Sequence, residues 1–211
     1  MKKIVILLIT LVSVAELSAQ VEFRSGITLG AGQSKLRDIT LVPGLDYAEL
    51  FSTKHNYSLG YKFRLAPRDK HLFIDIDILT GFRQVIYSYI EDFWLKNEDV
   101  ADGMRPMSGF PTKTNYYQLS LNPTLNYKFY DGWYVGVGAE PSLYFAHEVA
   151  SSKTDDEFYK IDVPVTGRIG YDFKYIDVAV SYKHGLFNIL DPERFNTGKL
   201  NYWQLQVFIP F

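Results

Sequence analysis

The final stretch of the sequence, NYWQLQVFIPF from Asn201 to Phe211, decides the fold. Successive side chains of an extended strand point to opposite faces. One face of this stretch is apolar throughout, and it consists of Trp203, Leu205, Val207, Ile209 and Phe211. The opposite face includes two glutamines, Gln204 and Gln206. Such alternation predicts a strand with one face in an apolar environment and the other in a polar one.

The same period-2 alternation recurs upstream, from Val21 onward, and divides the chain into eight segments. These segments are residues 21–32, 56–66, 71–83, 117–129, 133–145, 159–171, 175–183 and 201–211. Pro123, Pro141 and Pro164 fall inside three of them. Because proline has no N–H for a strand ladder, we expect bulges or register adjustments at these positions.

The connections between the segments alternate between short and long. The short ones are residues 66–70, 130–132 and 173–174, and the long ones are 33–55, 84–116, 146–158 and 185–199. Short turns at one end and long loops at the other are typical of transmembrane barrels. The sequence therefore predicts an all-β fold, an eight-stranded antiparallel up-and-down transmembrane β-barrel.

A soluble barrel of the lipocalin type also alternates, with its apolar face inside, so the direction of the apolar face needs further signals. The polar face carries small residues that suit a crowded interior: Gly60, Gly136, Gly138, Ser58, Ser120 and Ser142. Rings also gather near the segment ends, as expected for residues at the two membrane interfaces. They are Tyr127, Phe129, Trp133, Tyr171, Tyr175 and Phe211 at the turn end, and Tyr117, Phe145, Tyr159, Tyr182 and Trp203 at the loop end. Both signals favour a membrane barrel.

The first 19 residues have the features of a secretory signal peptide. Two lysines precede an apolar run from Ile4 to Val14, and Ser18 and Ala19 provide the small residues of a cleavage site after Ala19. The apolar run is too short for a permanent spanning helix, which needs ~20 residues. We expect residues 1–19 to be cleaved and residues 20–211 to form the barrel, exported to the outer membrane of a Gram-negative cell.

Composition excludes several other functions. The chain has no cysteine and a net charge of −2, so we expect no disulfide, no thiolate metal site, no lipid-modified cysteine and no nucleic-acid partner. No cofactor is predicted.

Two resemblances support the barrel. The terminal strand, with an aromatic last residue and apolar residues at every second position before it, resembles the signal by which outer-membrane barrels are recognised by their insertion machinery. The second half of the mature chain resembles the PorT-like family of small outer-membrane β-barrels. The matching positions are Gly136, Gly138 and Pro141 of a GxGxxP strand, and Tyr182, Gly185, Leu186, Asn188 and Ile189 of a Y-x-x-GLxNI close. The resemblance implies an accessory role in protein secretion.

Charged residues on the polar face would share the narrow interior of the barrel. They are Arg24, Lys62, Arg64, Asp75, Asp77, Arg83, Glu140, Asp162, Arg168 and Asp177. Unpaired charges there would be costly, so we expect a network of opposite-sign pairs. Eight strands leave room for side chains and little else, which favours a packed interior over a thin water path.

The connection 84–116 is the richest candidate for contact with a partner. It carries Tyr87, Tyr89, Phe93 and Trp94 among acidic residues, and exposed rings are frequent anchors of interfaces. The alternative is a hairpin that continues above the membrane and packs on its own rings.

Two groups of residues suggest chemical sites. Ser181 and His184 suggest an esterase, but three positions along a strand put them on opposite faces. His147 with Glu148, Asp155, Asp156 and Glu157 suggests a divalent cation site, although such a charge run is usually solvated.

The sequence thus predicts a non-enzymatic barrel with a structural or surface-interaction role. Its expected partners are outer-membrane lipid, the barrel-assembly machinery through the last strand, and an extracellular or envelope protein through the loops. The alternatives are a porin-like channel for small solutes and a PorT-like accessory barrel in secretion.

Overall fold

The computed structural model describes residues 21–41, 45–52, 54–67, 71–91, 110–150, 156–173, 175–190 and 195–211. The signal peptide predicted at residues 1–19 lies outside this described part. Nearly all described residues are in strands, and no helix among them is long and apolar enough to cross a membrane.

Eleven strands form in the described part of the chain. They are β1 (Val21–Leu41), β2 (Leu45–Ser52), β3 (Lys54–Pro67), β4 (Leu72–Glu91), β5 (Phe110–Tyr130), β6 (Trp133–Ala139), β7 (Ser142–Ala150), β8 (Asp156–Asp162), β9 (Val165–Phe173), β10 (Ile176–His184) and β11 (Phe195–Pro210).

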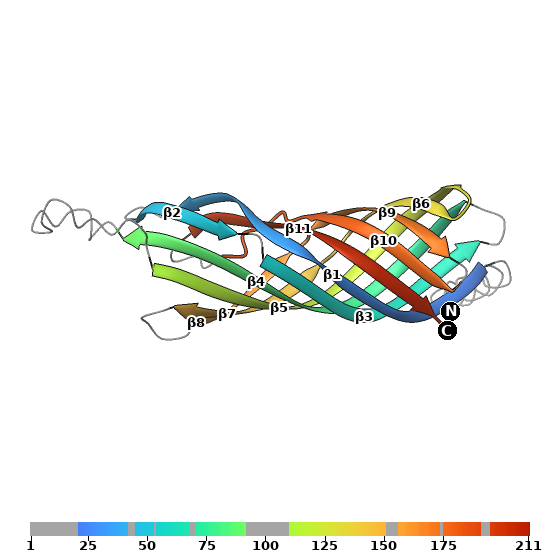
Figure 1. The fold of residues 1–211 in the computed structure, drawn as a ribbon, viewed down its shortest axis with the longest axis horizontal. Helices are drawn as coiled ribbons and strands as arrows, with labels where there is room; N and C mark the ends of the chain where they lie inside the picture. Colours follow the sequence, from blue (N-terminus) through green and yellow to red (C-terminus); the bar gives the residue numbers. More distant parts are fainter. Residues whose placement is uncertain are drawn as a thin grey trace, which may run out of the picture.

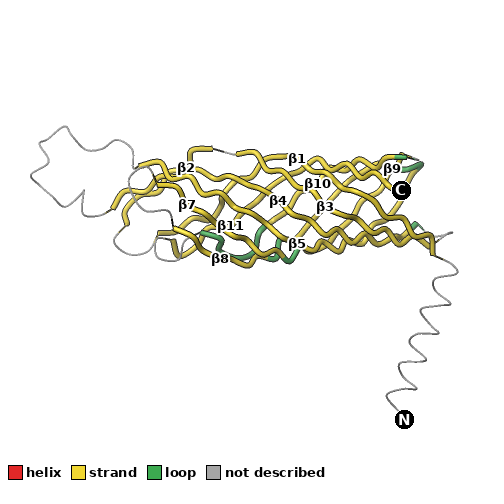
Figure 2. The backbone as a smooth tube through the Cα atoms, turned by 90° about the horizontal axis from the view of Figure 1, so that it is seen from below, coloured by secondary structure: helices red, strands yellow, loops and turns green. Residues whose placement is uncertain are grey.

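These strands close into one antiparallel ring with eight positions, as predicted (Figures 1 and 2). Two of the eight positions are each filled by two short strands in succession, β6 then β7 and β8 then β9, and β5 pairs with both β6 and β7. The ring has no free edge because β4 pairs with β5 and β1 pairs with β11. β2 lies outside the ring and pairs only with the far end of β4.

Several strands are about twice as long as a membrane requires. β1 and β5 each have 21 residues, whereas a spanning strand needs ~9–11. The long connections predicted from the sequence are therefore partly strand. For example, β4 and β5 stay in register up to the pair Tyr89 and Phe110, so this connection continues as a hairpin. The extensions lie at the end opposite the C-terminus, where Figure 1 shows β2, β7 and β8.

The expectation of register adjustments at the prolines was wrong. Thr124 pairs with Gly138 in β6, and four residues earlier Ser120 pairs with Ser142 in β7, so the register is unchanged across Pro141. The strands break locally, but proline still has a carbonyl. Pro141 accepts a hydrogen bond from the N–H of Leu121 at 3.1 Å, and Pro164 accepts one from Glu140 at 2.8 Å.

The outer face of the ring is an apolar band between two levels of aromatic residues. On β5, Tyr117 and Tyr127 both point outward, with exposed leucines between them. They are ten residues apart, or ~33 Å along a strand at ~3.3 Å per residue. With a tilt of ~40° this corresponds to an apolar height of ~25 Å, as in outer-membrane barrels. The polar face points inward, which rules out the lipocalin orientation.

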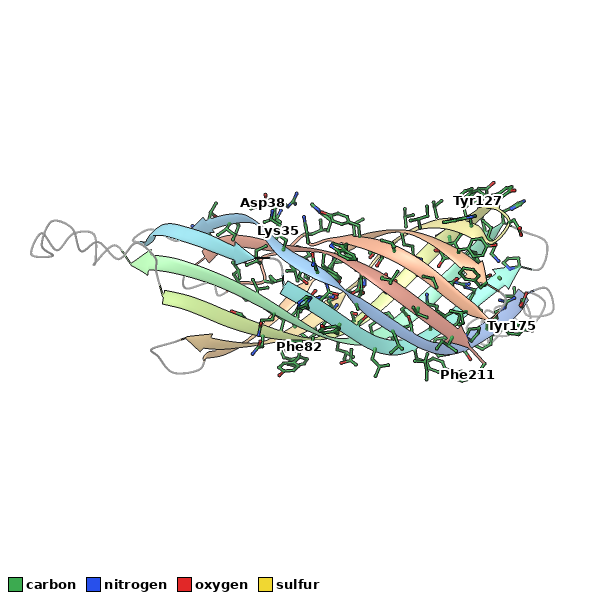
Figure 3. All side chains as sticks on the ribbon, viewed as in Figure 1. Lys35, Asp38, Phe82, Tyr127, Tyr175 and Phe211 are labelled. Atoms are coloured by element: carbon green, nitrogen blue, oxygen red, sulfur yellow. The ribbon has the colours of Figure 1, made fainter. Side chains whose placement is uncertain are left out.

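The upper aromatic level is a continuous row across neighbouring strands. Tyr57, Phe82, Tyr117 and Phe145 are successive cross-strand partners on β3, β4, β5 and β7. The lower level includes Trp133 and Tyr171, whose ring centroids are 5.3 Å apart. Figure 3 labels Tyr127, Tyr175 and Phe211 at this lower end and Phe82 farther along the barrel.

Candidate functional site

The lumen of the barrel carries a balanced set of charges. Among the described residues, five cationic and five anionic side chains are buried. They are Lys62, Arg64, Arg83, Arg168 and Lys183, with Asp75, Asp77, Glu140, Asp162 and Asp177. Since these charges cancel, the interior has no excess charge that would have to be neutralised by bound ions.

Asp75 lies at the centre of the lower part of this set. Arg64 donates to its two oxygens at 2.7 and 2.9 Å, in the bidentate geometry that strengthens such pairs. Lys62 Nζ lies 3.6 Å from the same carboxylate, and Arg168 donates to it from across the barrel. One carboxylate thus contacts three cations from β3 and β9.

Two further carboxylates, those of Asp77 and Asp177, contact the same three cations. Asp77 lies 3.4 Å from Lys62 and 3.5 Å from Arg168, and Asp177 lies 2.9 Å from Arg64. An added Cβ at Gly136 would lie 2.1 Å from Asn126 Oδ1 and 3.2 Å from Arg168 Cγ. The glycine therefore makes room mainly for Asn126, which accepts a hydrogen bond from Arg168 at 2.8 Å.

A second polar cluster is centred on Glu140, nearer the extracellular end. Glu140 pairs with Lys183 and accepts hydrogen bonds from Gln118 at 2.6 Å and from the Tyr202 hydroxyl at 2.9 Å. The guanidinium of Arg83 lies 3.6 Å from the centroid of the Tyr202 ring. A cation over an aromatic face is stabilised by the ring quadrupole.

An apolar cap, residues 185–190, covers this cluster. Its Ile189 and Leu190 are fully buried against Leu36, Val85 and Leu200, among other residues. The backbone of the cap is held on both sides. Ile189 N–H donates to Gly198 at 3.0 Å, and Asp162 accepts from the N–H groups of Leu186 at 3.0 Å and Phe187 at 2.9 Å. The cap places an apolar layer above the polar interior.

The structure places the ten residues predicted for the interior as follows. Nine are buried inside the ring, and Arg24 is at the rim, where its side chain is 34% exposed and lies 2.6 Å from Glu22. Sequence reasoning omitted Lys183. The period of two could have identified it, because Lys183 lies on the same face of its strand as Asp177 and Ser181.

The five residues of the terminal strand all face outward. Trp203, Leu205, Ile209 and Phe211 are exposed and Val207 is half-buried. Phe211 is joined to β1 through its N–H, which donates to Ser25 at 2.9 Å, and its ring lies 6.0 Å from the Tyr61 ring.

The remaining sequence candidates are placed only in part. The backbone of Tyr87 and Tyr89 pairs with β2, whereas Phe93 and Trp94 lie outside the described residues. Asp155 also lies outside them, and for the other four members of the suggested cation site the structure describes only the backbone, in β7 and β8.

Ser181 and His184 point in different directions, as the strand period requires. Ser181 is buried in the lumen and donates to the Gln204 carbonyl at 3.3 Å. His184 instead contacts Arg37 on the outer wall, with 2.7 Å between Nε2 and Nη2. They do not form a hydrolytic pair.

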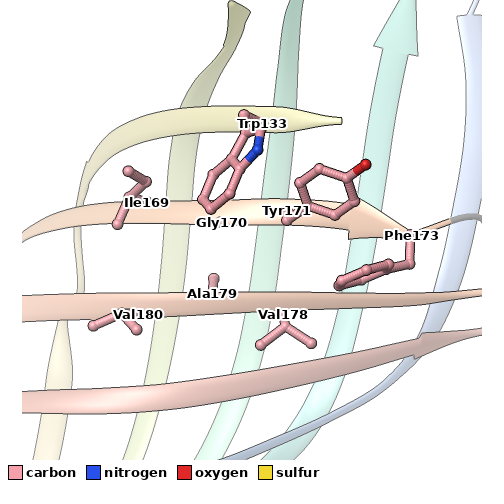
Figure 4. Close-up of a pocket in the computed structure, with 8 residues that line it drawn as sticks. All are labelled: Trp133, Ile169, Gly170, Tyr171, Phe173, Val178, Ala179 and Val180. Carbon is pink, nitrogen blue, oxygen red and sulfur yellow. The ribbon is translucent and has the colours of Figure 1, made fainter. Parts of the chain in front are cut away.

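Two grooves lie on the outer wall. One, of ≈ 390 Å³, is near the turn end and is lined almost entirely by apolar residues, including Trp133, Ile169, Phe173 and Val180 (Figure 4). It opens toward the hydrocarbon of the membrane and offers lipid chains an apolar surface only. The other, of ≈ 350 Å³, is lined by the aromatic pair Tyr182 and Trp203 and by the cations Lys35 and Arg37.

Residues 18–191 match the family model described as outer membrane protein beta-barrel domain. The match spans most of the chain and all eight ring positions except the last strand. The chain belongs to this family.

Solved structures agree with the fold of the outer membrane protein beta-barrel domain family. The Yersinia pestis attachment invasion locus protein Ail, solved with the heparin analogue sucrose octasulfate, has a TM-score of 0.51 and 13% identity, covering 90% of this chain and 99% of that one. Neisserial surface protein A has a TM-score of 0.50 and 14% identity, with the same coverage. A search of curated proteins gives no significant match.

Membership of the outer membrane protein beta-barrel domain family identifies the compartment. The apolar outer band is therefore a lipid-facing surface of the outer membrane. The match shows this broad family, and it does not show the PorT-like subgroup that the sequence motifs suggest.

Proposed function

We propose that this protein is a non-enzymatic outer-membrane barrel whose extended extracellular strands are a binding surface for an extracellular or envelope protein. The single observation that carries the proposal is the filled lumen. The buried charged side chains that line it are 0–5% exposed, and the apolar cap lies above them. A barrel filled in this way acts through its outer surfaces.

The surface proposed for binding is the end opposite the C-terminus. β2 and the upper parts of β4 and β5 extend beyond the upper aromatic row, so their backbone lies outside the membrane. Ail, whose fold is similar, was solved with a polyanionic heparin analogue, which is an example of a small barrel with an external ligand. We keep Tyr87, Tyr89, Phe93 and Trp94 as the contact residues.

The porin alternative makes the opposite prediction about conductance. If the interior is filled, purified refolded protein should give no steady channel openings in a planar bilayer with ordinary electrolyte, because no water-filled path crosses the polar clusters and the cap. The same preparation should show heat-dependent gel mobility as proof of folding. Stable openings in folded protein would support the porin and reject the proposed function.

A PorT-like accessory role in secretion is a second candidate, and it rests on the motif resemblance of Gly185, Leu186, Asn188 and Ile189, which belong to the cap. The two roles differ in the partner that they require. A secretion role needs a neighbour in the cell envelope, and a surface role allows a ligand from outside the cell.

Photo-crosslinking in intact cells tests the binding surface. A photoreactive amino acid at Tyr87 or Trp94 should capture a defined partner, whereas the same group at Leu121, in the lipid-facing band and 44% exposed, should capture none. Capture of a secretion component would favour the PorT-like role. Identical patterns from Tyr87, Trp94 and Leu121 would contradict a loop-mediated interaction.

A further inference from the structure

The basic groove on the outer wall lies where β1, β11 and β10 are neighbours. It is lined by Gln33, Lys35, Arg37, Tyr182, Asn201, Tyr202 and Trp203. Strand pairing brings Gln33 opposite Trp203, Lys35 opposite Asn201, and Arg37 opposite Lys199. Figure 3 labels Lys35 and Asp38 on β1, away from the end that carries Phe211 and Tyr175.

The upper half of the groove has unbalanced positive charge. Arg37 and Lys199 are directly opposed across the strands, an arrangement that is destabilising by itself because like charges repel. Lys35 lies two residues below Arg37 on the same face. Asp38, 3.2 Å from Arg37, is the acid that the described residues provide there. Three cations against one carboxylate leave the groove able to accept an anion.

Arg37 offers the groove an accessible guanidinium. Its Nη2 contacts His184 and Asp38, and its side chain is 40% exposed. The planar guanidinium group matches the geometry of phosphate.

The lower half of the groove is aromatic and faces the membrane. Tyr182 and Trp203 are cross-strand partners, and both are about half exposed, at 51% and 46%. Gln33 is the partner of Trp203, so along β1 Lys35 lies two residues above the level of Trp203 and Arg37 lies four residues above it. With ~3.3 Å per residue and a tilt of ~40°, the cations lie ~5–10 Å above the rings. This is the level of lipid headgroups, just outside the hydrocarbon core.

We propose that this groove binds a phosphorylated glycolipid of the outer leaflet. Its phosphate contacts Lys35, Arg37 and Lys199, and its sugar and upper acyl segments pack on Trp203 and Tyr182. A lipid fits better than a soluble polyanion because half of the groove is an aromatic surface that opens toward the membrane. The site is separate from the loop surface proposed above, so either can fail without the other.

The test compares two charge-matched variants of the folded barrel in neutral detergent micelles. The groove variant is Lys35→Gln with Arg37→Gln. The control, Arg24→Gln with Lys128→Gln, removes the same charges from the rim at the turn end, where both side chains contact Asp172. Native mass spectrometry measures binding of lipid A that carries two phosphates, and of the same lipid with its phosphates removed.

We expect the groove variant to bind the phosphorylated lipid about 10- to 30-fold more weakly than the natural protein, since each cation near an anionic headgroup layer contributes ~1 kcal/mol. The control should bind as the natural protein does, and removal of the phosphates should weaken binding to the natural protein by a similar factor.

Equal affinity of the groove variant and the natural protein would overturn the proposal, as would equal affinity for the two lipids. Displacement of the lipid by sucrose octasulfate at equal concentration would assign the groove to a soluble polyanion and also overturn it. Heat-dependent gel mobility verifies that both variants are folded.

Discussion

Replacing Asp75 by asparagine is expected to lower the free energy of unfolding by about 3–5 kcal/mol, the usual cost of removing one partner from a buried ion pair. The shape of the side chain is nearly unchanged, so the effect reports the charge. Asp75 is fully buried and contacts Lys62, Arg64 and Arg168. Without its carboxylate, these three cations keep Asp77 and Asp177 as their nearest acids. Among the buried charged residues that the structure describes, five cations would then face four anions.

The measurement is urea unfolding of refolded protein in lipid vesicles, followed by tryptophan fluorescence. Glu22→Gln is the matched control, because Glu22 also forms an ion pair with an arginine but has a side chain that is 46% exposed. Its loss should cost less than about 1 kcal/mol, as for other exposed pairs. Equal unfolding midpoints for the two variants would show that Asp75 is hydrated, and would remove the basis for a filled interior.

Replacing Phe211 by serine, or deleting it, is expected to remove most of the protein from the outer membrane of living cells while leaving refolding in detergent nearly unchanged. This follows from our proposal that Trp203, Leu205, Val207, Ile209 and Phe211 form the strand that the assembly machinery recognises. Phe211 itself lies at the turn end and is 77% exposed. Even a charged residue placed near an interface costs only about 0–1 kcal/mol, far less than at the midplane, so we expect a small cost for an uncharged serine and lost stability would not explain lost protein.

The control for this experiment is Phe129→Ser. Phe129 also faces outward at the turn end, with 50% exposure, but it belongs to β5. Its replacement should leave the amount of protein in the outer membrane almost unchanged. Immunoblots of isolated outer membranes give the in vivo result, and heat-dependent mobility after dilution from urea gives the refolding yield. Similar loss for both variants, or loss for neither, would reduce Phe211 to one more lipid-facing ring.

The membrane-crossing part of the fold was predictable because the bilayer imposes a strict local rule. Between the two aromatic levels every second residue faces lipid, as in the leucines between Tyr117 and Tyr127, so a period of two is enough to identify the strands. Above the upper aromatic row, lipid no longer imposes this rule on the outward face of the strands, and the alternation weakens. The continuation of the 84–116 connection as a hairpin was therefore only one of two alternatives, and the existence of β2 was not anticipated.

The cap shows a different limit. Ile189 and Leu190 are apolar residues inside a barrel whose inner face is otherwise largely polar, so they contradict the pattern used to assign inside and outside. Their burial depends on Leu36, Val85 and Tyr116, which are far away in sequence, and no local signal reports such a contact. The motif resemblance drew attention to the Gly185–Ile189 segment, but its role in closing the mouth required the three-dimensional fold.

The pairing of β1 with β11 has a consequence for the order of events in folding. It joins residues as distant in sequence as Gly26 and Pro210, and the entropy of loop closure must be lost before such contacts contribute any stability. Every other neighbour in the ring is closer along the chain, so this seam is the contact of highest contact order. The N-terminal strands cannot therefore complete a stable unit while the rest of the chain is still being exported. The whole barrel has to be kept unfolded and soluble until β11 is present, and it then closes in one cooperative step.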